Sequence, residues 1–259
     1  MITYNAVFAL LSEASATAQT EEIGAVAGFF KGIGDSFYQN FVYENRWQYL
    51  VNGLGTTLLI TLLSVILGML LGFLIAVVRV THDKTGRLKV LDLIAKIYLT
   101  VIRGTPVVVQ LLIIYFMIFA TVNIDAMFVA VLAFGLNSAA YVAEIVRSGI
   151  MSIDNGQFEA GSSLGFSYSK TMIYIILPQA FKNVLPALAN EFIVLLKETS
   201  IAGYISIQDL TKGGEIIQGL TYDPFLPMLA VAAIYLVMVM FLTRMVTKLE
   251  RRLANNDKR

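Results

Sequence analysis

The sequence predicts an all-α integral membrane protein with about five transmembrane helices. Hydrophobic residues make up 57% of the 259 residues and charged residues only 14%, whereas a soluble domain carries roughly a quarter charged residues. A helix that crosses a bilayer needs about 20 mostly apolar residues. Five segments meet this condition, and they lie approximately at 53–78, 94–120, 125–146, 184–205 and 225–247. Composition and segment length therefore exclude an ordinary soluble domain.

Residues 1–50 precede the first predicted span and mix aromatic with charged side chains. The aromatic and charged members of residues 20–50 are Phe29, Phe30, Phe37, Phe41 and Trp47, and Lys31, Asp35, Glu44 and Arg46. This mixture favours an amphipathic helix or helix pair at the outer interface of the membrane. A loosely ordered leader is the alternative. The apolar start of the chain lacks a basic segment, so we do not expect a cleaved signal peptide.

The positions of Lys and Arg orient the predicted spans. Basic residues gather after the first and third spans and in the tail, at Arg79, Lys84, Arg87, Lys89, Arg147, Lys170, Lys182, Lys248, Arg251, Arg252, Lys258 and Arg259. Basic connections stay in the cytoplasm. The N-terminus is therefore expected outside and the C-terminus in the cytoplasm. Residues 51–250 form one transmembrane domain, with a cytoplasmic loop at 150–180 and a basic cytoplasmic tail at 251–259.

The second span contains the run Arg103-Gly104-Thr105-Pro106, followed by Gln110. Gly104 and Pro106 predict a kink or local unwinding near the middle of the span, where freed carbonyl groups could line a cavity. Arg103 and Gln110 are seven residues apart, which places them on one face of a continuous helix.

Polar residues also lie inside the third and fourth spans. A buried charge costs about 2.5–3.5 kcal/mol at the centre of a membrane helix, so such side chains rarely face lipid. The candidate residues of a polar pathway are Arg103, Thr105, Gln110, Asn137, Tyr141, Glu144, Asn190, Glu191, Lys197 and Glu198. Internal ion pairing, such as Glu144 with Arg147, is the alternative for any one of them. Taken together, the set favours a pathway inside the bundle.

A polar interval from Gln157 to Pro178 separates the third and fourth spans. Ser152 or Asp154 can cap a first short helix, and Ser167 can cap a second one that ends near Pro178. Glu159 offers a charge and Phe158 and Leu164 offer apolar contacts among small residues. These features favour a surface on which another protein docks. A simple solvated loop is the alternative.

The spacing within this interval resembles the cytoplasmic coupling loop of ABC-importer permeases. The matching positions are Glu159-Ala160-Gly161, Gly165 and Ile175-x-Leu177-Pro178, with Gly161 where a second Ala is usual. Three further runs resemble the polar amino-acid branch of that family, including histidine-, glutamine- and arginine-type permeases. They are Arg103–Pro106 with Gln110, Leu136–Glu144 and Leu196–Ser200. The resemblance covers approximately Asn52 to Arg252.

The resemblance implies a type I ABC-importer permease fold in a bacterial cytoplasmic membrane, crossed several times. It also implies a homo- or heterodimer of permease subunits, two ATP-binding cassette subunits that carry ATP and Mg²⁺, and an extracytoplasmic solute-binding protein. Arg103 or Lys197 could bind the carboxylate of a polar amino acid, and Glu144, Glu191 or Glu198 its ammonium. The coupling-loop residues implied by the match are Gln157, Phe158, Glu159, Ala160, Gly161, Leu164, Gly165, Leu177 and Pro178.

The sequence offers no catalytic constellation of its own. It has no cysteine and one histidine, His82, so a conventional metal or thiolate site is not expected. The segment Gly161–Gly165 matches G-x-S-x-G only by chance, because no α/β sheet pattern accompanies it. No phosphate-binding loop is present, so ATP would be hydrolysed on another chain, and no cofactor or nucleic-acid partner is expected. An ion-gradient-driven secondary amino-acid transporter is the alternative, although such proteins usually contain an internal repeat.

Overall fold

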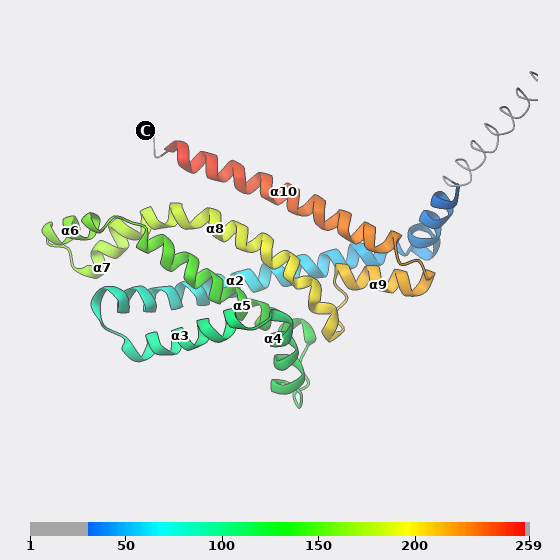
Figure 1. Ribbon diagram of the computed structural model, residues 1–259, viewed down its shortest axis with the longest axis horizontal. Helices are drawn as coiled ribbons and strands as arrows, with labels where there is room; N and C mark the ends of the chain where they lie inside the picture. Colours follow the sequence, from blue (N-terminus) through cyan, green and yellow to red (C-terminus); the bar gives the residue numbers. More distant parts are fainter. Residues whose placement is uncertain (1–30, 257–259) are drawn as a thin grey trace, which may run out of the picture.

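The computed structural model describes residues 31–256, and within that range every assigned element is a helix. The helices form an elongated bundle (Figure 1). The longer ones are α2 (Trp47–Thr85), α3 (Lys89–Gly104), α5 (Ala126–Met151), α8 (Leu177–Glu198), α9 (Leu210–Thr221) and α10 (Leu226–Asn256). Length and composition allow four spans in the described range, or five if α3 and the bent segment after it are one span. The predicted fold class is therefore confirmed.

Helices α2 and α5 form the centre of the bundle and approach each other closely. A Cβ added at Gly68 would lie 2.8 Å from the Ser138 Cβ, and one added at Gly72 would lie 2.7 Å from the Val142 Cβ. The spacing Gly68-x-x-x-Gly72 thus serves as a helix-packing face, since small residues allow two membrane helices to pack backbone to backbone.

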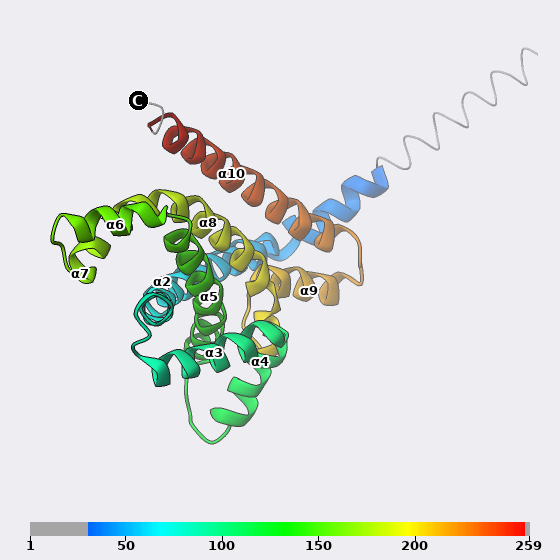
Figure 2. The same cartoon turned by 60° about the vertical axis from the view of Figure 1, so that its left-hand side comes forward.

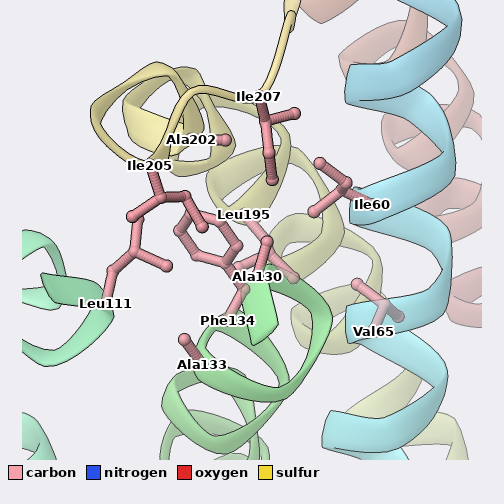
Figure 3. Packing of buried hydrophobic residues seen from close by; sticks show 10 residues of the cluster. All are labelled: Ile60, Val65, Leu111, Ala130, Ala133, Phe134, Leu195, Ala202, Ile205 and Ile207. Atoms are coloured by element: carbon pink, nitrogen blue, oxygen red, sulfur yellow. The ribbon is translucent and has the colours of Figure 1, made fainter. Parts of the chain in front are cut away.

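A buried apolar cluster joins α2, α5 and α8 to the segment after α8 (Figure 3). Phe134 of α5 is fully buried, and Leu195 of α8 and Ile60 of α2 belong to the same cluster. Leu111 adds the helix α4 (Val107–Ile113), while Ile205 closes the cluster from the 3₁₀ helix η5 (Thr199–Ile205). Because lipid tails are as apolar as these side chains, the cluster is stabilised by close van der Waals packing between the helices. The cluster fixes the relative positions of these elements.

The second predicted span is broken rather than merely kinked. Helix α3 ends at Gly104, and α4 with the π-helical turn η3 (Ile114–Ile118) leaves it at 109° (Figure 2). Thr105 is extended because a residue before proline is driven out of the helical region. The predicted break at Gly104 and Pro106 is confirmed. The expectation that Arg103 and Gln110 share one helical face is wrong, because no continuous helix joins them.

The interval between α5 and α8 contains α6 (Asn155–Ser163), α7 (Tyr168–Thr171) and the π-helical turn η4 (Met172–Ile176). The prediction that the second short helix ends near Pro178 is wrong, since helical structure continues from η4 into α8. Pro178 lies in the first turn of α8. The turn before it is π-helical, with the Leu177 amide bonded to the Met172 carbonyl, and Pro178 has no amide hydrogen to donate, so the regular α-helical hydrogen-bond pattern is interrupted at this junction.

The two ends of the bundle carry different segments (Figure 1). Helices α6 and α7 and the C-terminal end of α10 lie toward one end, while α9 and residues 31–45 lie toward the other. Residues 31–45 are helical, in agreement with the helix expected there, and residues 1–30 lie outside the described range. The Asn40 amide donates to the Asp223 carboxylate (2.7 Å) and accepts from the Thr221 hydroxyl (2.8 Å). These bonds fasten the segment to the turn between α9 and α10.

Candidate functional site

Helix α6 has a defined cap at each end. At its start, the Asp154 carboxylate accepts a hydrogen bond from the Gly156 amide (2.6 Å), so Asp154 rather than Ser152 caps the helix. At its end, Gly165 has a φ of +76°. The Phe166 amide donates to the Gly161 carbonyl and the Gly165 amide to the Ser162 carbonyl, each at 3.0 Å. This is a Schellman motif, which explains the glycine at position 165.

Gly161 is buried against the next short helix. A Cβ at this position would lie 2.6 Å from both the Cγ2 and the Oγ1 of Thr171. The side chain of Thr171 is itself buried. The glycine where the coupling loop usually has a second alanine therefore follows from the threonine that it faces. Ser167 occupies the cap position of α7 but makes no side-chain hydrogen bond there.

The outward side of α6 presents few but distinct side chains. Glu159 and Ala160 are exposed, and Leu164 is 72% exposed. Ile173 and Tyr174 of η4 are also exposed, at 57% and 69%. Exposed apolar side chains grouped with one charge are typical of an interaction surface. No residue pattern distinguishes Ile173 and Tyr174 in the sequence, although both lie within the matched loop.

Phe158, expected as a second protruding contact, is half-buried instead. Its ring stacks on the ring of Tyr168 at 6.4 Å between centroids, and the Lys84 ammonium lies 4.6 Å from its centre. Gln157 accepts a hydrogen bond from Gln179 of α8 at 3.4 Å. Leu177 is partly buried and Pro178 exposed. Within the matched loop, Phe158 and Gly161 thus pack inward, and Glu159 and Leu164 face outward.

Three of the candidate pathway residues hold the break between α3 and α4. The Gln110 amide donates to the carbonyls of Ile102 (2.7 Å) and Thr105 (3.0 Å) and to the Thr105 hydroxyl (2.8 Å). Its oxygen accepts from the Asn137 amide at 3.2 Å. Gln110 and Asn137 are buried. The freed carbonyls are therefore satisfied by Gln110 rather than left open to a cavity.

Arg103, Tyr141 and Glu144 lie together between α3 and α5. The Arg103 and Glu144 side chains approach to 3.8 Å, and the Arg103 guanidinium lies 5.7 Å from the centre of the Tyr141 ring. Arg147 binds Glu144 more closely, at 2.8 Å, and also contacts Asp83 at 3.4 Å. The expected ion pair of Glu144 with Arg147 is thus present, while Arg103 keeps only a long contact.

Arg103, Tyr141 and Glu144 line two hollows. The first, of about 530 Å³, continues along α2 and α3 past Arg79 and Lys96. The second, of about 400 Å³, continues along α5 and α8 past Ser148 and Asn183. A cation, an anion and an aromatic ring are therefore accessible together, and this combination can bind a zwitterion.

The candidate residues of α8 are less organised. Glu191 accepts a hydrogen bond from the Ser138 hydroxyl at 3.1 Å. Asn190 and Lys197 are exposed and Glu198 is half-buried. Within residues 31–253, no ion pair connects Lys197 to a neighbouring helix. The structure thus brings Arg103, Tyr141 and Glu144 together, and it does not bring the α8 residues to them.

A second charged cluster lies where α2 turns into α3. Asp92 is buried and pairs with Arg79 (2.9 Å) and Lys96 (2.8 Å), and the His82 ring nitrogen lies 3.2 Å from it. His82, Asp83 and Asp92 could geometrically surround a cation. Two basic side chains already neutralise Asp92, however, so the cluster is explained as an ion-pair network. No local sequence pattern indicated this cluster beyond the predicted basic connection.

Comparisons with known proteins agree with this geometry. A family model described as the binding-protein-dependent transport system inner membrane component matches residues 64–255. The chain is 45% identical over 166 residues to the arginine transport system permease protein ArtQ of Bacillus subtilis (strain 168), covering 63% of this chain and 76% of that protein. It is 36% identical over 223 residues to the L-cystine transport system permease protein TcyB of the same organism, covering 85% and 93%.

Solved structures give the same result. A structure titled "Crystal structure of an amino acid ABC transporter with histidines" matches with a TM-score of 0.74 and 44% identity, covering 82% of this chain and 98% of that chain. The MetNI methionine ABC transporter in an inward-facing form matches with a TM-score of 0.67 and 19% identity, covering 80% and 97%. This second likeness shows a shared fold.

Proposed function

The chain belongs to the family of binding-protein-dependent transport system inner membrane components, and we propose that it is the permease subunit of an ATP-driven importer for polar amino acids. The names of its relatives support the substrate class, since they refer to arginine, glutamine and cystine. The relatives are named as permease proteins, so ATP hydrolysis and its Mg²⁺ would belong to a separate subunit. None of them supports the ion-gradient alternative.

The observation that carries this proposal is the doubly capped helix α6 at one end of the bundle. Its caps hold Glu159 and Leu164 outward in a fixed orientation, and Ile173 and Tyr174 of η4 are exposed as well. A short helix with one charge and apolar neighbours suits insertion into a groove of a partner. In this proposal, two cytoplasmic ATPase subunits bind the α6 helices of two permease subunits, identical or related.

The orientation and the remaining partners follow from the same assignment. The basic connections place α6, residues 150–180 and the tail 251–259 in the cytoplasm, and residues 1–50 outside. The membrane is the bacterial cytoplasmic membrane, and 51–250 form the transmembrane domain. An extracytoplasmic solute-binding protein would deliver the amino acid to the face that carries α9.

Within the bundle, Arg103, Tyr141 and Glu144 are the best placed to contact the amino acid. Arg103 would bind the substrate carboxylate and Glu144 its ammonium group, with Tyr141 beside them. Arg103 keeps only a 3.8 Å contact with Glu144, and both side chains reach two open hollows, while the other carboxylate oxygen of Glu144 stays paired with Arg147. Gln110 and Asn137 would act indirectly by holding the adjacent break.

The test is a purification in mild detergent from native membranes, followed by mass identification of the bound proteins. We expect a stoichiometric ATPase subunit whose ATP hydrolysis rises when L-arginine, L-glutamine or L-histidine is added with the solute-binding protein. Glu159→Lys should abolish recovery of the ATPase without changing membrane insertion. Glu250→Lys makes the same charge change at an exposed position of α10 and should have no effect. Recovery of the ATPase with Glu159→Lys would contradict the proposed docking site.

A further inference from the structure

The last turn of α2 reaches across to the first turn of α6. The Lys84 ammonium donates a hydrogen bond to the Asn155 side-chain oxygen (2.8 Å) and lies 4.6 Å from the centre of the Phe158 ring. Asn155 and Phe158 are three residues apart, so they occupy one face of the helix. A single ammonium group therefore holds the face of α6 that is turned toward α2.

The Phe158 ring has a cationic and an aromatic neighbour. Lys84 approaches it from α2, and Tyr168 of α7 stacks on it with an angle of 14° between the rings. A cation over an aromatic face is attracted by the negative charge of the ring centre. Because the Phe158 ring is half-buried, the Lys84 contact adds to the packing of the ring.

The neighbouring charges do not compete for Lys84. Asp83 is adjacent in sequence, but its carboxylate accepts from Arg147 at 3.4 Å and lies 3.8 Å from His82. Within residues 31–253, no carboxylate forms an ion pair with Lys84. The preferred partners of its ammonium are thus the amide oxygen and the ring of α6.

Apart from these side-chain contacts, α6 packs mainly against α7 and η4. From α8, Gln179 donates a hydrogen bond to Gln157 at 3.4 Å, and Phe158 itself packs against the apolar cluster that contains Ala76 and Val80 of α2. Lys84 adds a polar contact between α6 and α2, and α2 packs against α5 along its length.

We propose that Lys84 is a positioning residue for α6, which ties this helix to α2 and transmits its displacement to the centre of the bundle. The transmission step rests on the proposed docking of an ATPase on α6. The positioning step does not, since it depends only on the contacts of Lys84. Asp83 lies in the same turn of α2 as Lys84 and pairs with Arg147. Arg147 also pairs with Glu144, which lies beside Arg103. A movement of the last turn of α2 would therefore be transmitted through Asp83 and Arg147 to Glu144, one of the proposed substrate-binding residues.

The positioning step can be tested with spin labels, because the chain contains no cysteine that would need to be removed. One pair of labels at Ser163→Cys and Leu74→Cys reports the position of α6 relative to α2. A second pair at Leu74→Cys and Phe128→Cys reports the packing of α2 with α5. The distance distributions of both pairs are measured in nanodiscs on four versions of the full chain. These are the chain with Lys84 unchanged and the variants Lys84→Met, Lys84→Arg and Lys89→Met.

Lys84→Met should broaden the distance distribution of the first pair and leave the second unchanged. Lys84→Arg should restore the narrow distribution, since its guanidinium also donates hydrogen bonds and binds aromatic faces. Lys89→Met removes a positive charge from the same turn, where Lys89 makes no ion pair within the described residues, and should have no effect. An unchanged first pair in Lys84→Met, or equal broadening in Lys89→Met, would overturn the proposal.

The transmission step is tested separately by titrating the recovered ATPase subunit onto each variant. Loss of one hydrogen bond and one cation–π contact should weaken binding on the order of fivefold, and Lys84→Arg should bind like the unmodified chain. Equal binding by Lys84→Met would overturn transmission. If the unmodified chain bound no ATPase while Lys84→Met still broadened the first pair, the proposed function would fail and the positioning role would stand.

Discussion

Replacement of Gly161 by alanine sets two opposing effects against each other. Alanine favours a helix over glycine by about 1 kcal/mol, so this substitution in the last turn of α6 would stabilise an isolated helix. In the folded chain, the new Cβ would lie 2.6 Å from both the Cγ2 and the Oγ1 of Thr171 and 3.1 Å from its Cβ. Both branch atoms face Gly161, so any staggered rotamer of Thr171 leaves at least one of them in the way.

The clash should outweigh the gain in helix propensity. Inserting a methyl group into a packed site costs about 1–3 kcal/mol, so the net destabilisation of α6 is up to about 2 kcal/mol. Hydrogen exchange of residues 155–163 measures this local opening directly. We expect Gly161→Ala to speed exchange of these amides on the order of tenfold, since about 1.4 kcal/mol corresponds to a factor of ten. Exchange in α5 should not change.

A second substitution identifies the cause. Thr171→Ala removes both atoms that lie at 2.6 Å, and it removes a buried hydroxyl that has no hydrogen-bond partner. The double variant Gly161→Ala with Thr171→Ala should therefore exchange more slowly than Gly161→Ala alone. Ser162→Ala, at an exposed position of the same helix, serves as the control for helix propensity. If Gly161→Ala slowed exchange, or if Thr171→Ala failed to reverse its effect, the close approach of the two residues would not explain the glycine.

Two further predictions concern the opposite end of the bundle. Gly53→Ala should lower the thermal midpoint of the purified protein strongly, because a Cβ there would lie 2.4 Å from the backbone oxygen of Asp209, which cannot rotate away; Gly55→Ala, two residues along α2 in open space, should leave it unchanged or raise it slightly. An equal fall of the thermal midpoint in both variants would show that helix flexibility, and not the close contact at Gly53, determines the effect. Burial raises the pKa of Asp209 to about 6, against the opposing hydrogen bond from the Lys212 amide. Because the folded pKa exceeds the unfolded value near 4, the thermal midpoint should rise as the pH falls from about 6 to about 4; Asp209→Asn should lack this gain, and parallel profiles for the two proteins would refute the assignment.

The sequence predicts the membrane spans well because they depend on one local property. The first predicted segment falls within α2, and the third and fifth each begin one residue before their helix, at Asp125 before α5 and at Phe225 before α10. Helix α2 nevertheless extends well beyond the apolar segment, to Thr85, because Gly86 with a φ of +67° is the residue that stops it. Apolar length gives the part inside the membrane, and capping residues decide where the helix ends.

The candidate site was less accessible to prediction, because it depends on contacts between distant segments. The spacing of the loop indicated that Glu159 and Leu164 matter, and both are exposed. Nothing local indicated that Phe158 would be contacted by Lys84, which lies in the last turn of a different helix, α2. Likewise, helical periodicity placed Gln110 beside Arg103, whereas the break at Pro106 turned it back toward Ile102. Periodicity fails wherever the backbone ceases to be periodic.

The hydrogen bonds of Gln110 have a mechanical consequence for the bent segment. A hinge works when backbone groups can exchange partners at little cost as the angle changes. At this bend, one buried amide holds the carbonyls on both sides, Ile102 and Thr105, and is itself fixed by Asn137 of α5. Opening the angle would strand several buried polar groups at once, each costing roughly 1–3 kcal/mol. Helices α3 and α4 should therefore move together as a rigid bracket, and any change of shape in the bundle must be absorbed elsewhere.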